Sequence, residues 1–94
     1  MTEYELMTIT KVSGGEDNAR DVSNAIKDQI SALKGKVLNS DFMGKRRFAY
    51  KIGQDTEGFF DVILFDADAA CVEKIKIKLN LMENLQRYLI KRKG

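Results

Sequence analysis

Histidine and tryptophan are both absent from the 94-residue chain, and cysteine occurs only once, at Cys71. Without histidine, the chain lacks the commonest general base and the commonest metal-binding side chain. A Cys–His nucleophile pair is therefore impossible, and one thiolate without an imidazole is a poor set of zinc ligands. A single cysteine also cannot form a disulfide within the chain, as is usual in a reducing intracellular compartment. We therefore expect no enzyme activity, no bound metal and no cofactor.

Long apolar runs and phosphate-binding loops are also lacking. No apolar run approaches the ~18 residues that cross a membrane. The first residues, MTEYELM, are acidic, unlike the basic and apolar start of a signal peptide. The segment SGGED contains two glycines but has neither the lysine nor the spacing of a P-loop. We expect one cytoplasmic domain over residues 1–94, with no membrane contact and no small-molecule substrate.

Charge is unevenly distributed along a chain whose net charge is only +2. Residues 34–51 contain six basic side chains and one acidic one, and residues 74–94 contain seven and one. The segment between them, residues 52–73, contains six acidic side chains and no basic one. A fold that brought the two basic blocks together would form one basic surface.

The periodicity of apolar residues predicts two helices and four strands. Residues 16–34 place Ala19, Val22, Ile26, Ile30 and Leu33 at three- and four-residue steps, which is the pattern of an amphipathic helix ending near Gly35. Residues 68–81 read either as a helix or as an alternating strand, and the possible N-cap residues Asp66 and Asp68 favour the helix. Strands are predicted at residues 3–12, 36–52, 59–65 and 84–92, with a polar turn at 53–58.

This order predicts an α+β, ferredoxin-like βαββαβ fold: a four-stranded antiparallel sheet with both helices on one face. In that topology the first and third strands are central, so the two basic strands lie at opposite edges. Gly44 is the expected bulge in the 17-residue second strand, and a bulge there would invert the faces of the residues that follow. The expected core residues are Val22, Ile26, Ile30, Leu33, Val62, Leu64, Val72, Ile75 and Leu79.

Four segments resemble the bacterial small-subunit ribosomal protein S6 family, over essentially the whole chain. They are YELMTI at residues 4–9, GKRRFAYKI at 44–52, the glycine–aromatic start at 58–59, and ENLQRYLIKR at 83–92. The resemblance implies a non-catalytic structural protein that pairs with ribosomal protein S18 and binds the central domain of small-subunit rRNA. Many members have proline where this chain has Lys51, and many carry a charged C-terminal extension, whose role is not transferred to a chain ending at Gly94.

Candidate binding residues follow from this resemblance and from the chemistry of RNA contacts. Arginine forms bidentate contacts with phosphates, and arginine and aromatic planes stack on bases. Opposite basic edges suit two different contacts better than one continuous stripe. We therefore expect one group at rRNA, and a second group at the protein partner or rRNA. The first comprises Tyr4, Arg87, Lys91 and Arg92, and the second comprises Lys45, Arg46, Arg47 and Tyr50.

Simpler roles remain open for these residues. The Lys45–Arg47 run also suits an edge strand protected from aggregation by charge. Tyr4 could simply anchor the first strand, and the cations near the C-terminus could form an ordinary basic tail.

Two other functions compete with the ribosomal one. A ferredoxin-like small-molecule module or acylphosphatase-like hydrolase would need an arginine–asparagine phosphate pocket after the first strand, where this chain has SGGED. A sheet-face RNA binder of the RRM type would need aromatics with a basic–glycine signature on the central strands. Here Phe59, Phe60 and Phe65 stand in a core-like run without that signature.

Overall fold

The structure, a computed structural model, describes residues 2–52 and 55–93, with side chains described except at 48–52 and 55–56. Its elements follow the predicted order of strand, helix, two strands, helix and strand, with one added 3-10 turn. They are β1 (Thr2–Thr10), η1 (Val12–Gly14), α1 (Gly15–Ala32), β2 (Lys36–Ile52), β3 (Asp55–Ala67), α2 (Ala69–Asn80) and β4 (Leu85–Arg92).

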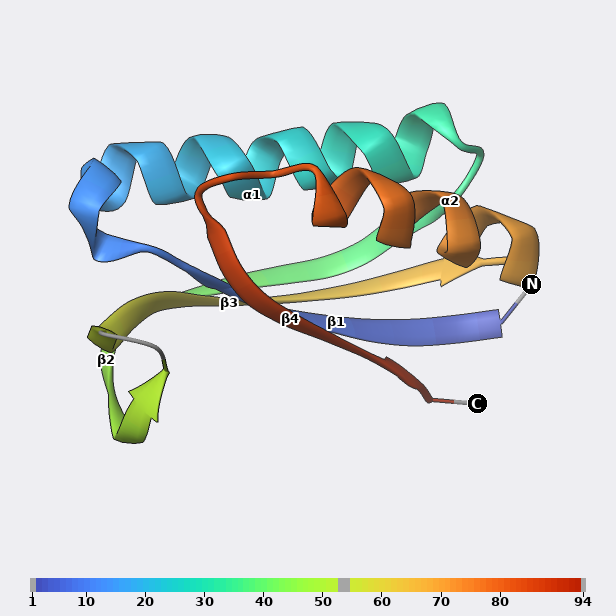
Figure 1. The fold of residues 1–94 in the computed structure, drawn as a ribbon. Helices are drawn as coiled ribbons and strands as arrows, with labels where there is room; N and C mark the ends of the chain where they lie inside the picture. Colours follow the sequence, from blue (N-terminus) through green and yellow to red (C-terminus); the bar gives the residue numbers. More distant parts are fainter. Residues whose placement is uncertain (1, 53–54, 94) are drawn as a thin grey trace.

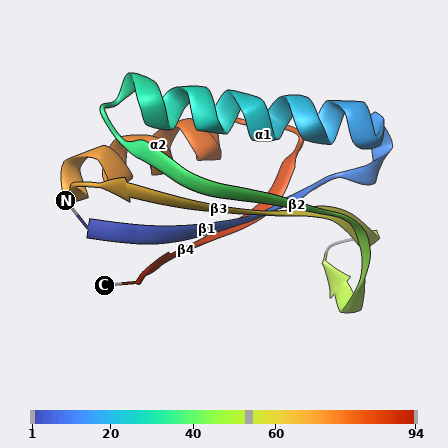
Figure 2. The same cartoon turned by 180° about the vertical axis from the view of Figure 1, so that it is seen from behind.

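The four strands form one antiparallel sheet in the order β2-β3-β1-β4. Both helices cover the same face of this sheet and leave the other face open (Figures 1 and 2). This arrangement confirms the predicted ferredoxin-like α+β fold. It also confirms that β2 and β4, which contain the basic candidates, are the two edge strands.

Helix α1 buries the stripe that its periodicity predicts. Ile26 and Ile30 are buried in the core, while Val22 and Leu33 are half-buried against it. The helix ends at Ala32, two residues earlier than predicted. Lys34 adopts the left-handed conformation (φ 70°) that is usually taken by glycine, and the amide of Gly35 donates to the carbonyl of Ile30 at 2.8 Å.

Gly35 is therefore required for close packing rather than for backbone freedom. A Cβ at this position would lie 2.8 Å from Cγ2 of Ile30 and 3.2 Å from the carbonyl oxygen of Asp66. Gly35 does follow the end of the helix, as predicted. Its role is to allow close packing, whereas Lys34 takes the left-handed conformation.

Helix α2 occupies the segment that the sequence left ambiguous. The side chain of Asp68 caps it by accepting a hydrogen bond from the Cys71 amide at 2.8 Å. Val72, Ile75 and Leu79 are buried at helical spacing, which rules out the strand reading of this segment. Asp66, the other candidate cap, lies in β3 instead.

The buried face of β3 is opposite to the one predicted. Val62 and Leu64 are half-buried on the open face, whereas Ile63 and Phe65 are buried beneath the helices. The run FFDVILF is apolar at both alternating positions, so its pattern does not distinguish the faces. Its one polar residue, Asp61, faces the helices, where the Ser23 hydroxyl donates to its carboxylate. The strand also begins at Asp55, inside the predicted turn.

Gly44 forms the predicted bulge in β2. Its φ is +82°, and the pairing of β2 with β3 shifts between Phe42 and Gly44. A second shift falls between Val37 and Asn39. An extra residue in one strand reverses the alternation of side chains beyond it. The faces of Lys45, Arg46 and Arg47 are therefore set by this bulge.

Candidate nucleic-acid and protein interface

The three consecutive cations of β2 lie on two faces of the sheet. Lys45 pairs with Phe59 and Arg47 with Glu57, positions that share the helix-covered side of β3. Arg46 pairs with Gly58 and lies on the open face. Cross-strand partners in an antiparallel sheet share a face, so this register assigns each side chain. The strand can thus contact different molecules on its two sides.

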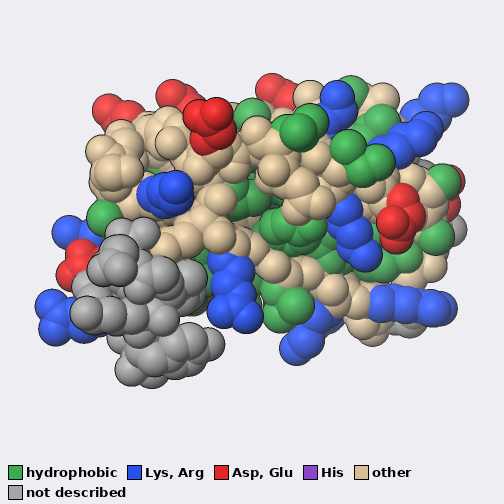
Figure 3. Space-filling model, viewed as in Figure 1, with side chains coloured by type: hydrophobic (Ala, Val, Ile, Leu, Met, Phe, Trp, Pro, Cys, Tyr) green, Lys and Arg blue, Asp and Glu red, His purple; other side chains and the backbone are tan. Residues whose placement is uncertain are grey.

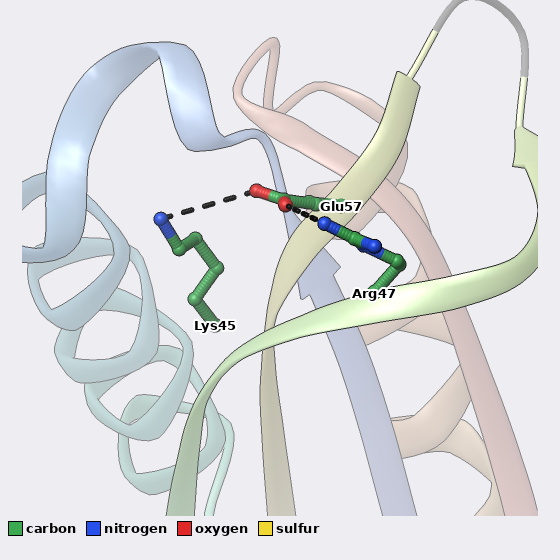
Figure 4. A network of polar contacts seen from close by, with 3 residues as sticks. All are labelled: Lys45, Arg47 and Glu57. Carbon is green, nitrogen blue, oxygen red and sulfur yellow. Dashed lines mark ion pairs between the residues drawn. The ribbon is translucent and has the colours of Figure 1, made fainter.

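Glu57 on β3 forms ion pairs with both Lys45 and Arg47 on the neighbouring strand β2 (Figure 4). Its two carboxylate oxygens lie 3.9 Å from Nζ of Lys45 and 3.7 Å from a guanidinium nitrogen of Arg47. Both cations remain mostly exposed, at 59% and 80% of their side-chain surface. Exposed ion pairs contribute little free energy, so these cations stay available to a stronger anion. The fourth candidate of this group, Tyr50, lies outside the described side chains.

The basic candidates of β4 also divide between the faces. Arg87 pairs with Ile9 and Lys91 with Glu5, both on the open face. Arg92 pairs with Tyr4 on the helix-covered side. Arg87, Lys91 and Arg92 are all exposed. The structure therefore brings two of the predicted rRNA contacts together on the open face and the other two on the opposite side.

Tyr4 has a clear structural role. Its ring stacks on Phe65, with centroids 5.7 Å apart and an interplanar angle of 25°. Phe65 is fully buried, and Tyr4 is half-buried against the same core. The side chain therefore anchors β1 whether or not it also contacts RNA, and its role in rRNA binding stays a prediction.

An apolar patch covers the middle of the open face, and this patch was not predicted from the sequence. The cross-strand pairs Met7–Leu89 and Met7–Val62 place three apolar side chains in one row, and Leu89 is 54% exposed. Only the paired register shows which apolar residues share this face, although apolar residues at both alternating positions of β3 were a signal for it. The open-face patch comprises Met7, Ile9, Phe60, Val62, Leu64 and Leu89.

Acidic side chains separate the two basic edges. Glu3 pairs with Asp66 on the open face, at the end of the sheet near the C-terminus. Glu5 lies beside them and forms an ion pair with Lys93 at 3.4 Å. These acids, together with the apolar patch, lie between the two edges on the open face, so the basic blocks do not merge into one surface. The edges are suited to separate contacts.

Acidic side chains border the loop that follows β1. Glu16 and Asp17 occupy the first turn of α1, beside the loop where an acylphosphatase-like site would lie, and Arg20 pairs with Glu16 at 3.6 Å. Within residues 2–52 and 55–93, no group of three His, Cys, Asp or Glu side chains is arranged to hold a metal. Across the same residues, no helix is long and apolar enough to cross a membrane.

Two basic sheet edges and an apolar open face on a ferredoxin-like domain are features of a protein that binds other macromolecules. The sequence model of the family described as ribosomal protein S6 matches residues 3–92. The chain therefore belongs to the ribosomal protein S6 family. This membership confirms the resemblance seen in the sequence and the expected location, on the ribosome in the cytoplasm.

Individual relatives agree with this assignment. The chain is 32% identical over 90 residues to the small ribosomal subunit protein bS6 of Dictyoglomus turgidum, covering 96% of this chain and 93% of the relative. It is 26% identical over 90 residues to bS6 of Fusobacterium nucleatum, covering 96% of each chain.

Solved structures match the fold in the same way. The crystal structure of 30S ribosomal protein S6 from Thermotoga maritima superimposes with a TM-score of 0.93 at 27% identity, covering 98% of this chain and 87% of that one. The C-terminal domain of the MgtC protein from Mycobacterium tuberculosis has a TM-score of 0.67 at 13% identity, covering 99% and 88%, and shares the fold alone.

Proposed function

We propose that this protein, acting as one domain over residues 1–94, binds the central domain of small-subunit rRNA together with ribosomal protein S18 and catalyses no reaction. The observation that carries the proposal is the open face of the sheet, where an apolar patch lies between Arg46 on β2 and Arg87 with Lys91 on β4. Family membership supports a structural role on the small subunit.

The protein partner is assigned to the apolar patch and its β2 border. Protein interfaces combine an apolar centre with a polar rim, and Leu89 with Arg46 supplies one of each. Leu89 is 54% exposed, so a partner would remove a large apolar surface from water. On the β2 edge, Arg46 lies on the open face and borders this contact.

The rRNA is assigned to the β4 edge. Arg87 and Lys91 lie four residue pairs apart on the same face of an edge strand, with Leu89 between them, so each can reach a separate phosphate. A chain of net charge +2 attracts RNA weakly by itself. The partner therefore has to add positive charge and contact area, which explains why the two proteins would bind RNA together.

Calorimetry of the protein with S18 tests the partner surface without RNA. We expect Arg46→Ala and Leu89→Ser to weaken pairing by about tenfold or more, because interface anchors commonly contribute over 1 kcal/mol. Leu81→Ser is the matched control, since Leu81 is 73% exposed and lies just after α2, away from the sheet. If both variants bound S18 normally, the open face would not be the surface that binds this partner.

A salt titration of the protein–S18 pair on an rRNA central-domain fragment tests the RNA edge. Replacing Arg87 and Lys91 by alanine should lower the slope of log affinity against log salt by roughly one to two units, since each phosphate contact releases about 0.7–0.9 counterion. The control replaces Lys74 and Lys78, exposed cations of α2. An unchanged slope with Arg87 and Lys91 replaced would contradict the assignment of the edge.

The non-catalytic part of the proposal has its own test. The protein should not accelerate hydrolysis of an acyl phosphate above the buffer rate. Turnover that a point substitution abolishes would favour the hydrolase instead.

A further inference from the structure

A small hollow opens between the last turn of α2 and the beginning of β4. It has a volume of ≈ 270 Å³ and lies on the helix-covered side of the β4 edge. Figure 3 shows this side of the molecule, with apolar side chains gathered between α2 and β4 and Lys and Arg side chains around them. The lining residues are Leu79, Asn80, Met82, Leu85, Gln86, Arg87 and Tyr88.

The lining combines an apolar base with neutral hydrogen-bonding groups. Leu79 is buried in the core, and Leu85 packs against it. The phenol of Tyr88 donates to the side-chain oxygen of Asn80 at 3.0 Å, which holds the carboxamide of Asn80 beside the phenol oxygen. This bond uses the amide oxygen and leaves the NH₂ group of Asn80 to donate elsewhere.

We propose that this hollow takes one unstacked nucleobase of the bound RNA, with Arg87 at the adjoining phosphate; the inference rests on the proposed rRNA binding. RNA-binding proteins stack splayed-out bases on aromatic rings and read the base edges with hydrogen bonds. Tyr88 supplies the ring, and Asn80 with Gln86 supplies two carboxamides. Asn and Gln are the side chains that pair with the edge of adenine.

Charge favours a nucleotide over other ligands of this size. The described lining contains one cation, Arg87, and no acidic side chain, so nothing in it repels the phosphate that accompanies a base. The volume is below the ~300 Å³ at which pockets for drug-sized ligands begin, which suits a single flat ring system.

Because the hollow lies at an edge strand, a nucleotide could place its base on the helix-covered side of the sheet and its phosphate on the open face. Arg87 pairs with Ile9 on the open face, while Tyr88 pairs with Thr8 on the helix-covered side. Only at an edge can one strand of RNA contact both sides of the sheet, because an inner strand is closed off by its neighbours. The RNA chain would therefore pass around the edge formed by β4.

Binding of two single-stranded hexamers to the protein–S18 pair tests this inference. One probe is an RNA hexamer of adenosines, and the other is an abasic ribose–phosphate hexamer of equal charge. We expect the adenosine hexamer to bind roughly 5- to 150-fold more tightly, the range of one base stacked on an aromatic ring. Asn80→Ala and Tyr88→Leu should abolish this difference without changing the salt slope.

Two variants distinguish a loss of base binding from a loss of folding. Asn80 is exposed, so Asn80→Ala should fold normally, and Asn24→Ala on α1 is the matched exposed control. Tyr88→Phe keeps the ring and should retain part of the preference for the adenosine hexamer. Equal affinity for both hexamers, or a preference that survives Asn80→Ala and Tyr88→Leu, would overturn the inference.

Binding of the rRNA central-domain fragment distinguishes a failure of the base site from a failure of the proposed function. If the pair binds this fragment through Arg87 and Lys91 but does not prefer the adenosine hexamer, only the base site is wrong. If the pair binds neither the fragment nor the hexamers, the proposed function fails, and the base site fails with it.

Discussion

Ser23 and Asp61 are hydrogen-bonded inside the molecule, where the serine hydroxyl of α1 donates to the carboxylate of β3. Both residues are buried, and the second oxygen of the Asp61 carboxylate has no hydrogen-bond partner among the described residues. Ser23 therefore supplies a donor that this buried acid needs, and it ties the long helix to the central sheet.

Replacing Ser23 by alanine should destabilise the fold by about 1–3 kcal/mol, because a buried carboxylate would lose its donor. Urea unfolding measures this free energy. Ser31→Ala, an exposed serine of the same helix, is the control and should change stability by less than about 0.5 kcal/mol. A Ser23→Ala variant as stable as this control would show that the hydrogen bond contributes nothing measurable.

Two isoleucines test the assignment of the core. Ile26 is 1% exposed and Ile77 is 61% exposed, and both lie in helices. Ile26→Ala should cost about 2–5 kcal/mol because it leaves a cavity beneath α1. Ile77→Ala should cost little, since it removes a side chain already in water. Similar losses for the two variants in chemical denaturation would contradict the burial described above.

Two glycines should respond differently to larger side chains. Gly44→Ala should cost about 1–2 kcal/mol from its left-handed backbone alone, since an added Cβ there meets nothing within 4 Å. Gly44→Asn should recover part of that loss, because asparagine tolerates this conformation.

Gly35 is the contrasting case, because its constraint is space. Neither alanine nor asparagine should be tolerated, as any Cβ would meet Ile30. Thermal unfolding of the four variants checks both predictions, and asparagine rescue at Gly35 would refute the packing explanation.

Cys71 makes stability depend on pH at alkaline values. Burial raises the pKa of the Cys71 thiol above its ordinary 9.0, the Asp68 carboxylate raises it further, and Lys74 partly opposes this. The unfolded chain therefore loses the thiol proton at lower pH than the folded protein. The stabilisation is complete below the ordinary thiol pKa and is lost as pH rises through the folded pKa.

The measurement is urea unfolding as a function of pH for the wild type and Cys71→Ala. Stability of the wild type should fall more steeply above about pH 9 than that of the variant. Parallel curves would show that the thiol does not contribute. The difference between the two curves isolates the contribution of the thiol.

The helical periodicity of residues 16–34 was enough to predict α1, because one apolar stripe at 3.6-residue spacing has a single solution. Asp68 likewise indicated the start of α2, and its carboxylate does cap the helix. The face of β3 was not predictable in this way. Val62 and Ile63 are equally apolar, so burial was decided by which side the helices covered.

The candidate site shows the same division. The sequence by itself determined that two basic strands would stand at opposite sheet edges, since the order of elements leaves β2 and β4 outermost. It did not determine which of the β2 cations lie on the open face. Arg46 lies on the opposite face from Lys45 and Arg47 by the ordinary alternation of a strand, and the bulges in β2 decide that Arg46 is the one on the open face. Gly44 marked one bulge in the sequence, but the shift between Val37 and Asn39 depends on how β2 pairs with β3, so only the tertiary structure could assign the faces.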